Sequence, residues 1–286
     1  MDQGYNIGIL ENDFGAVNVD MMLLRELEGE QCELEMVAGG CDKDCHRRRF
    51  KTKLIAMGMC GYDRVLIEPS GIFDMDEFFD ALHEEPLDRW YQIGNVIAVV
   101  DAGLDEKMSE EADYILASEV ADAGCIVLSK TQEASEKYIE NTVKHLNRAL
   151  EAVHCKRKFG EDEIIRKDWE QFETEDFERI LNSGYIAEDY EKMSLDEKEV
   201  FKSLYFMDLE ISGKELRDAA QKIMQDPACG SVFRIKGFTQ ELDGSWTELN
   251  ATHHEMTQCP IAEGQKVIIV IGEQPDEEMI KKYLKA

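Results

Sequence analysis

Apolar positions in the first half of the chain alternate between short runs and longer stretches with helical spacing. The short runs predict strands over residues 6–10, 32–37, 64–67, 96–100 and 125–128. The stretches between them predict helices over residues 20–29, 46–61, 74–83, 109–123 and 134–153. Strands that alternate with amphipathic helices indicate a parallel sheet covered on both faces, so the first half predicts an α/β domain.

The pattern changes after residue 172. Residues 172–202 are polar, helix-prone and rich in Glu and Asp, and we interpret them as the end of the first domain plus a connector. Later apolar segments predict strands over 204–211, 231–239, 245–252 and 266–271, and helices over 213–224 and 276–284. An Asp243-Gly244 turn joins two of these strands. We therefore expect a first domain over 1–183, a connector over 184–203 and a small α+β domain over 204–286.

The acidic composition of the chain argues against two classes of binding partner, nucleic acids and anionic membranes. The chain has 286 residues, 43% of them hydrophobic, and a formal net charge of -29. Such a charge disfavours binding to nucleic acid or to an anionic membrane. The sequence has no apolar run near the roughly 18–20 residues that a membrane span needs, and it begins without a signal-peptide pattern. We expect a cytoplasmic protein.

Polar residues gather where the predicted parallel strands end, which is where such sheets bind ligands. Glu68-Pro69-Ser70-Gly71 follows one strand. A carboxylate at a strand end can hold Mg²⁺ or orient an attacking water, and Gly71 leaves its N–H free to approach a phosphate. An ordinary strand-to-helix turn is the alternative interpretation, since Pro and Gly are common turn residues.

The eight cysteines are expected to be reduced thiols, and most lie in apolar stretches. Only Cys41 and Cys45 lie close together in a polar segment, beside Asp42, Asp44 and His46. Thiolates at close spacing suit Zn²⁺ or similar ions. Two interpretations are open, namely a mixed sulfur, oxygen and nitrogen metal site or a pair of free thiols.

Five segments in order resemble the CobW family of GTP-dependent metal chaperones, within the P-loop metal-insertion GTPases. They are ENDFG at 11–15, GGC at 39–41 with Cys45, EPSG at 68–71, VVDA at 99–102 and LSKT at 128–131. The resemblance covers nearly the whole chain, and RIKG at 234–237 with the hairpin after it is similar to the family's C-terminal domain. It implies a parallel-sheet, P-loop NTPase-like domain followed by a small α+β CobW-type domain.

The resemblance also implies roles for individual residues. Glu68 becomes the catalytic residue for GTP hydrolysis, and nucleotide binding falls to Ser70, Gly71, Ser129 and Lys130. Metal binding falls to Glu11, Cys41 and Cys45. The implied cofactors are GTP, Mg²⁺ and Zn²⁺ (or Co²⁺), and the implied partner is a client metalloprotein, with the oligomeric state left open.

The chain departs from the family pattern near the base-recognition and metal motifs. Ser129 and Gln132 stand where the family shows Asn and Asp, so a charged acceptor for guanine is lost. Relaxed nucleotide specificity and loss of the nucleotide site are both open. Cys45 matches a family cysteine only approximately, and Ala16 stands where many members carry Glu.

The phosphate-binding loop G-x-x-x-x-G-K-[ST] does not occur in the sequence. In the family this loop precedes the segment that resembles ENDFG, so a first βα unit of roughly 25–30 residues is lacking. The sequence is either truncated, which we favour, or that of a loop-less relative. We expect a GTP-dependent metallochaperone that is inactive as a GTPase over residues 1–286. The alternative is a non-enzymatic metal-binding or partner-binding protein.

Two further clusters each carry two interpretations. The basic residues Arg47, Arg48, Arg49, Lys51 and Lys53 form either a solvated helix face or a contact for an anion or an acidic partner. His253, His254 and Cys259 form a second metal site only if the strand that carries them ends there, because adjacent strand residues point to opposite faces.

Overall fold

A computed structural model describes residues 4–13, 21, 24–38, 43–69, 75–191, 201–253, 255–262 and 264–285. The chain divides into two compact units, Met1–Ser194 and Leu195–Ala286. Among the described residues, we find no helix both long enough and apolar enough to cross a membrane.

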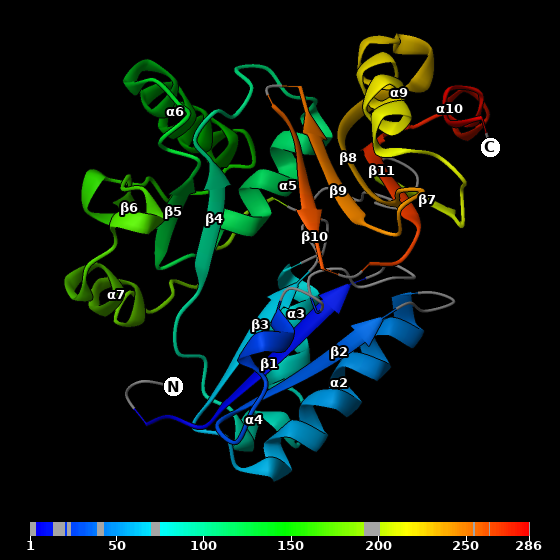
Figure 1. Cartoon of the computed structure of the whole chain (residues 1–286). Helices are drawn as coiled ribbons and strands as arrows, with labels where there is room; N and C mark the ends of the chain where they lie inside the picture. The colour runs from blue at the N-terminus through cyan, green and yellow to red at the C-terminus, as the bar shows by residue number, and fades with distance from the viewer. Residues whose placement is uncertain are drawn as a thin grey trace. The chain divides into compact units, whose positions relative to one another are not determined.

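The first unit opens with a three-stranded parallel sheet of β1 (Ile7–Asp13), β2 (Cys32–Ala38) and β3 (Arg64–Pro69), in the order β2-β1-β3. Helix α2 (Lys43–Cys60) packs along β2 (Figure 1). The short helices α3 (Met75–His83) and α4 (Leu87–Trp90) complete the same layer. Its core is formed by the apolar faces of these elements, including Leu10, Val37, Phe50, Leu54 and Phe78.

A second three-stranded parallel sheet follows, with β4 (Ile97–Asp101), β5 (Cys125–Ser129) and β6 (Ile164–Ile165) in that order. Helices α5 (Glu110–Ala121) and α6 (Glu136–Ala152) pack against each other. Each helix begins at a serine whose hydroxyl accepts a backbone N–H, Ser109 from Ala112 and Ser135 from Tyr138. The core between strands and helices includes Val100, Ile126, Leu128, Leu146 and Leu150.

Buried His145 ties α5 and α6 together. Its Nε2 lies 2.5 Å from Asp113 Oδ1 on α5, and its Nδ1 lies 2.8 Å from the Asp105 carbonyl oxygen. Thr142, also on α6 and buried, donates its hydroxyl to the Ala102 carbonyl at 2.8 Å. These bonds attach α6 to the segment that follows β4. Helix α6 therefore fixes the position of the carboxyl end of the second sheet.

The parallel α/β fold predicted for the first half of the chain is confirmed for the described residues. Among the described strands, β3 pairs only with β1 and β4 only with β5, so the strands form two sheets. The apolar runs predicted the strands themselves but carried no information on which strand lies beside which.

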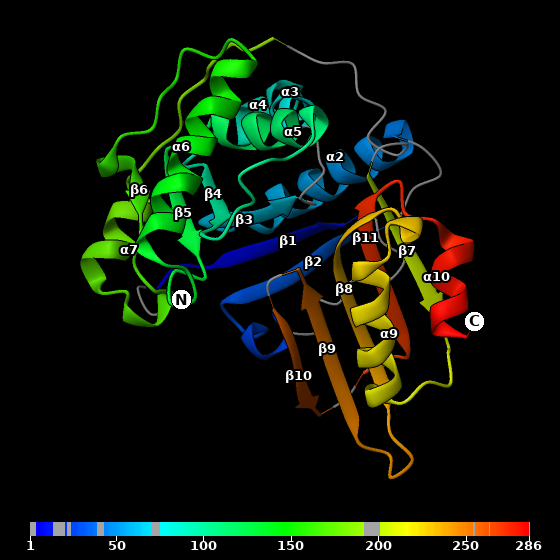
Figure 2. The same ribbon diagram turned by 90° about the horizontal axis from the view of Figure 1, so that it is seen from above.

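The second unit is a five-stranded antiparallel sheet, in the order β10-β9-β8-β11-β7. Its strands are β7 (Phe201–Met207), β8 (Ser231–Gln240), β9 (Trp246–Thr252), β10 (Met256–Ile261) and β11 (Val267–Glu273). Helix α9 (Gly213–Gln225) packs against β8 and β9, and α10 (Glu277–Leu284) packs against α9, as Figure 2 shows. The small α+β domain predicted for this region is confirmed.

Strands β7 and β10 differ from their predictions, whereas two helical segments agree with theirs in the described residues. The strand predicted over 204–211 is β7, which ends at Met207 because Asp208 takes a left-handed conformation with φ of 54°. Strand β10 was missed because its sequence, MTQCPI, has little apolar character and includes Pro260. Of residues 172–202, the described part holds the helix α7 (Thr174–Leu181). Of the helix predicted over 20–29, the described residues Met21 and Leu24 are helical, and a 3-10 turn follows at Arg25–Leu27.

Candidate functional site

The carboxyl end of the first sheet carries two predicted site residues side by side. In the parallel register Glu11 of β1 is the partner of Glu68 of β3, and on its other side of Met36 of β2. Register partners on neighbouring parallel strands point to the same face of the sheet, and the strands lie about 4.8 Å apart. Glu11 is buried, with 4% of its surface exposed, whereas Glu68 is exposed. The structure therefore brings two carboxylates together, as the sequence suggested for strand ends.

The thiol part of the predicted metal site is described only in part. Cys41 lies outside the described residues, as do Ser70 and Gly71. Cys45 lies in the first turn of α2 and is half-buried, next to the buried His46. Strand β2 ends at Ala38 and α2 begins at Lys43, so Cys45 lies close to the carboxyl edge of the sheet that also holds Glu11. Within the described part of the chain, no three His, Cys, Asp or Glu side chains form a group that could hold a metal ion.

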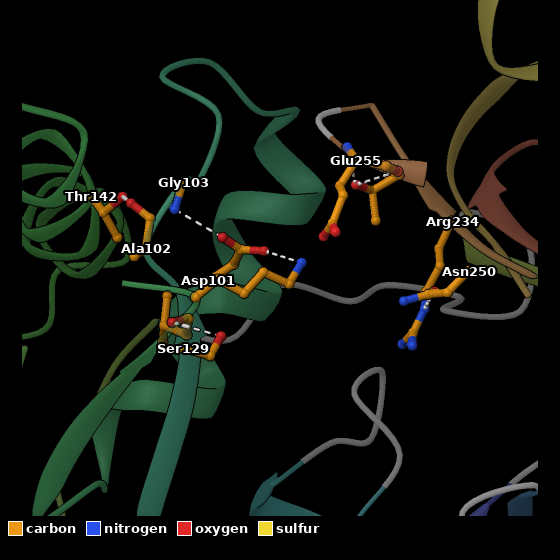
Figure 3. A network of polar contacts seen from close by, with 11 residues as sticks. Asp101, Ala102, Gly103, Ser129, Thr142, Arg234, Asn250 and Glu255 are labelled. Atoms are coloured by element: carbon orange, nitrogen blue, oxygen red, sulfur yellow. Dashed lines mark hydrogen bonds and ion pairs between the residues drawn. The ribbon is translucent and has the colours of Figure 1, made fainter. Parts of the chain in front are cut away.

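The carboxyl end of the second sheet is a network of short polar contacts. Asp101 at the end of β4 is the register partner of Ser129 at the end of β5. Lys130 follows with φ of 56°, and its ammonium lies 2.7 Å from Asp101 Oδ2. The other carboxylate oxygen of Asp101 accepts the Gly103 N–H at 2.8 Å (Figure 3). Both oxygens of Asp101 are thus engaged, one by a backbone N–H and one by Lys130.

The hydroxyl and the carbonyl of Ser129 both form hydrogen bonds with the backbone at the end of β4. Its hydroxyl donates to the Val100 carbonyl oxygen at 3.4 Å, and its own carbonyl accepts the Ala102 N–H at 2.9 Å. These bonds join β4 to β5 at their ends and give Ser129 a structural part. Gln132, which the resemblance aligns with a guanine-binding Asp, is exposed.

Sequence reasoning missed the part that Asp101 plays. The VVDA segment at 99–102 is one of the motifs that resemble the family, but no role was predicted for its aspartate, Asp101. The signal that could have found it is the position of Asp101 at the end of a buried strand, directly before the parallel neighbour that ends in Ser129-Lys130. Because parallel strands end at the same edge, an acidic and a basic residue at two successive ends predict an ion pair.

The basic cluster on α2 pairs largely with acidic residues of its own unit. Arg47 and Lys51 both contact Glu84, at 2.7 Å and 2.6 Å, and Lys53 contacts Glu35 at 2.7 Å. The hydrogen bond from Lys51, helped by Arg47, holds the pKa of Glu84 below its ordinary value. These pairs favour the first interpretation of the cluster, a helix face whose charges are matched within the molecule.

The C-terminal residues considered as a second metal site do not form one within the described part. His253 is exposed just after the end of β9, and His254 lies outside the described residues. Cys259 is exposed on β10 as the register partner of Glu248. Nearby polar contacts in this unit are structural: the side-chain Nε of Arg234 donates to Asn250 at 3.0 Å, and the Glu255 N–H to the Thr252 hydroxyl at 3.1 Å (Figure 3).

Parallel strands whose polar ends line one edge define an α/β protein of the nucleotide-binding type. The family model for the CobW/HypB/UreG nucleotide-binding domain matches residues 1–159, more than half of the chain. The chain therefore belongs to the CobW/HypB/UreG family, as the order of its motifs predicted.

A curated relative and two solved structures give further similarity. The chain is 30% identical over 141 residues to the zinc chaperone YjiA of Escherichia coli (strain K12), a match that covers 46% of this chain and 43% of the relative. It thus matches less than half the length of that relative. The zinc-bound YjiA GTPase from E. coli aligns with 98% of this chain and 97% of its own, at 17% identity and a TM-score of 0.37. A zinc-bound triple mutant of that GTPase aligns with 100% and 91%, at 18% identity and a TM-score of 0.39.

Proposed function

We propose that this protein is a GTP-dependent metallochaperone that carries zinc or cobalt as cargo and passes it to a client metalloprotein. The observation that carries the proposal is the placement of Glu11 beside Glu68 at the carboxyl end of the first sheet, with Cys45 close to the same edge. Family membership supports the nucleotide part and the cysteines support the cargo part.

Glu68 acts at the phosphate end of the site. Its carboxylate is exposed at the end of β3, where it can hold a metal-bound water or orient the attacking one. Oxygen ligands of this kind fit Mg²⁺, which supplies neutralisation of phosphate charge when bound. Ser70 and Gly71, directly after β3, supply a hydroxyl and a backbone N–H for the same phosphate.

Glu11, Cys41 and Cys45 hold the cargo ion. Two thiolates and a carboxylate form a donor set that suits Zn²⁺ or Co²⁺. Because Glu11 is the neighbour of Glu68, a cation bound at Glu11 reduces the repulsion between the two carboxylates. The charge at one position therefore changes the energy of the other, which is the condition for coupling between nucleotide and cargo.

Nucleotide preference is expected to be weak. Lys130 keeps the position from which its stem can pack on a purine, and Asp101 fixes the ammonium at 2.7 Å. Position 132 holds an amide instead of a carboxylate, so the charged acceptor for guanine N1 and N2 is lost. We expect GTP and ATP to differ in affinity by less than about tenfold, which corresponds to about 1.4 kcal/mol.

Residues 1–286 alone are expected neither to bind GTP tightly nor to hydrolyse it. Hydrolysis needs a cradle of backbone N–H groups, a lysine on the phosphates and a hydroxyl on Mg²⁺, all of which belong to the phosphate-binding loop that this sequence lacks. Measurable GTP turnover by the purified 286-residue chain would overturn this expectation.

A second candidate function is metal or partner binding without hydrolysis. Two observations favour it, namely the inward hydrogen bond of the Ser129 hydroxyl and the exposed Gln132 in place of an aspartate. The two candidates separate when the coding sequence ahead of Met1 is translated and expressed. A segment with a phosphate-binding loop and GTP turnover supports the chaperone GTPase, and zinc binding without turnover supports the binder.

Zinc titration tests the cargo site directly. We expect Cys41→Ser and Cys45→Ser each to weaken zinc binding by at least about tenfold, because each removes one thiolate ligand. Cys60→Ser is the matched control, since Cys60 is an exposed thiol at the end of α2, about four helical turns beyond Cys45. Equal zinc affinities in all four proteins would remove the cargo site from the proposal.

A further inference from the structure

Helix α7 is amphipathic, yet it buries none of its residues. Its apolar residues Phe177, Ile180 and Leu181 recur at helical spacing and share one face. Helix α6 of the same unit also has an apolar stripe, but it buries that stripe in the core of the second sheet, for example at Ile139 and Leu146. The core of the unit therefore does not account for the apolar face of α7.

Large apolar side chains are exposed on α7 and just before it. Trp169 is 67% exposed, Phe177 53% and Leu181 37%. The ring of Phe172 packs edge-on against Phe177, with centroids 5.7 Å apart, and the Phe172 N–H donates to the Trp169 carbonyl one turn earlier. Neighbouring exposed apolar groups of this kind are typical of a surface that binds another molecule. We refer to Trp169, Phe172, Phe177, Ile180 and Leu181 as the α7 surface.

Polar contacts attach the opposite side of α7 to the second sheet. The Arg179 guanidinium donates to the backbone carbonyls of Asp162 and of Ile164, the latter on β6 at 3.4 Å. Helix α7 lies beside β6 in Figure 1. Successive residues of a helix are about 100° apart, so Phe177 lies nearly opposite Arg179. Because Arg179 reaches β6, the apolar face of α7 is turned away from the sheet.

Carboxylates border the α7 surface. Asp176 and Glu178 flank Phe177 in the sequence and therefore lie on the two sides of the apolar stripe. Arg179 is the only basic residue between 169 and 181, and the preceding Lys167 contacts Glu173 and Asp176 at 3.0 and 2.8 Å. The acidic residues of this stretch are Glu170, Glu173, Glu175, Asp176 and Glu178. The α7 surface is thus apolar in the middle and negatively charged at its border.

We propose that the α7 surface docks a basic amphipathic segment of another protein. Apolar side chains of that segment pack on Phe177 and Leu181, and its Lys or Arg side chains contact the acidic border. Aromatic anchors surrounded by a polar rim are typical of protein interfaces, and a few such anchors carry most of the binding energy. Opposite charges at the rim add specificity and speed of association.

Charge selects this occupant over two others. A second copy of the chain would bring the same carboxylates to the interface, so two α7 surfaces that face each other would repel. An anionic membrane is disfavoured for the same reason, because the chain has a formal net charge of -29. A basic segment, in contrast, matches both the apolar centre and the charged border.

The test uses two fluorescein-labelled synthetic peptides of about 18 residues, long enough to form a helix. Both have the same leucine stripe, with lysine on the polar face of one and glutamate on the polar face of the other. Fluorescence anisotropy measures their binding to residues 1–286. We expect the lysine peptide to bind at least about tenfold more tightly than the glutamate peptide.

Phe177→Ala is expected to weaken binding of the lysine peptide by at least about tenfold, because it removes the central anchor. Tyr138→Ala is the matched control, since Tyr138 lies on α6 and is 54% exposed, nearly the same fraction as Phe177. It is expected to leave binding unchanged. Because both side chains are exposed, the melting temperatures of both variants are expected to stay within about 2 °C of wild type.

A charge reversal tests the border independently of the anchor. Glu178→Lys is expected to weaken the lysine peptide by at least about threefold and to strengthen the glutamate peptide, whereas Glu151→Lys at the exposed end of α6 changes neither. Equal binding of the lysine peptide to the Phe177→Ala and Tyr138→Ala variants would overturn the proposal.

Three further results would also overturn the proposal. The first is equal affinity of the lysine and glutamate peptides for wild type. The second is a dimer of residues 1–286 that Phe177→Ala dissociates, since a second copy would then occupy the α7 surface. The third is binding to phosphatidylglycerol vesicles that Phe177→Ala abolishes, since the surface would then bind a membrane. None of these measurements involves nucleotide or zinc, so failure of the metallochaperone proposal leaves them unaffected.

Discussion

The two parallel sheets of the first unit share one design but treat charge at their carboxyl ends in opposite ways. The second sheet ends in an acid and a base that neutralise each other, Asp101 and Lys130, with a backbone N–H on the remaining carboxylate oxygen. The first sheet ends in two acids that are register partners, Glu11 and Glu68. Like charges at this spacing repel, and a cation relieves the repulsion. The comparison teaches that the second sheet end is held by contacts between its own side chains, whereas the first sheet end carries the two carboxylates that we propose for ion binding.

The largest expected effect is a loss of stability when the hydrogen bonds between α6 and the second sheet are removed. His145→Ala removes a buried side chain together with its two hydrogen bonds, one to the partly buried Asp113 carboxylate and one to the Asp105 carbonyl oxygen, so we expect a loss of about 2–4 kcal/mol in the free energy of unfolding. Urea denaturation measures it.

His154→Ala is the control for that measurement. His154 contacts Glu191 on the surface, with 78% of its side chain exposed, so its loss is expected to change the free energy of unfolding by less than about 0.5 kcal/mol. Equally small effects of both substitutions would show that the hydrogen bonds of His145 on α6 do not stabilise the second sheet.

A smaller effect is expected for the ion pair at the end of the second sheet. Asp101→Asn keeps an oxygen for the Gly103 N–H but removes the charge that Lys130 contacts. Because both side chains are more than one third exposed, we expect a coupling energy of only about 0.5–1 kcal/mol. A double-mutant cycle with Lys130→Met measures it. A coupling energy of zero would remove the contrast between the two sheet ends.

The smallest expected effect is a dependence of stability on pH at Glu84. Its folded-state pKa is lowered by Lys51 and Arg47, so its contribution is present above the ordinary glutamate pKa and is lost as the pH falls through the lowered value. We expect Glu84→Gln to flatten the decline in the free energy of unfolding below pH about 4.5, by less than about 0.5 kcal/mol because the Glu84 side chain is 45% exposed. An unchanged acid limb would show that the basic face of α2 is not matched by Glu84.

The sequence predicted the elements well where burial alone determines them. Strands β1 to β5 arise from apolar runs, and their helices from apolar spacing with a serine at the start of α5 and of α6. It did not predict β10, because MTQCPI becomes a strand only through its pairing with β9. The two-residue β6 is likewise defined by its neighbour β5 and not by a pattern of its own.

The candidate site was predictable in its positions but not in its pairings. Glu11 and Glu68 were expected at strand ends, and their side-by-side register follows from strand order, which no local pattern encodes. Lys130 was expected to bind a nucleotide, but its contact with Asp101 depends on the parallel pairing of β4 and β5. The division into two sheets has the same origin, because strand neighbours are determined by tertiary structure and not by the composition of a strand.

The central claim is that the carboxylate pair at the end of the first sheet takes part in binding the cargo ion. Zinc affinity of the 286-residue chain, measured by competition with a chromophoric chelator, tests it in wild type, Glu11→Gln and Glu35→Gln. Glu35 lies on β2 but on the opposite face of the sheet, where it pairs with Lys53. We expect Glu11→Gln to weaken zinc binding by at least about tenfold and Glu35→Gln to leave it unchanged. The same zinc affinity in all three proteins would contradict the claim.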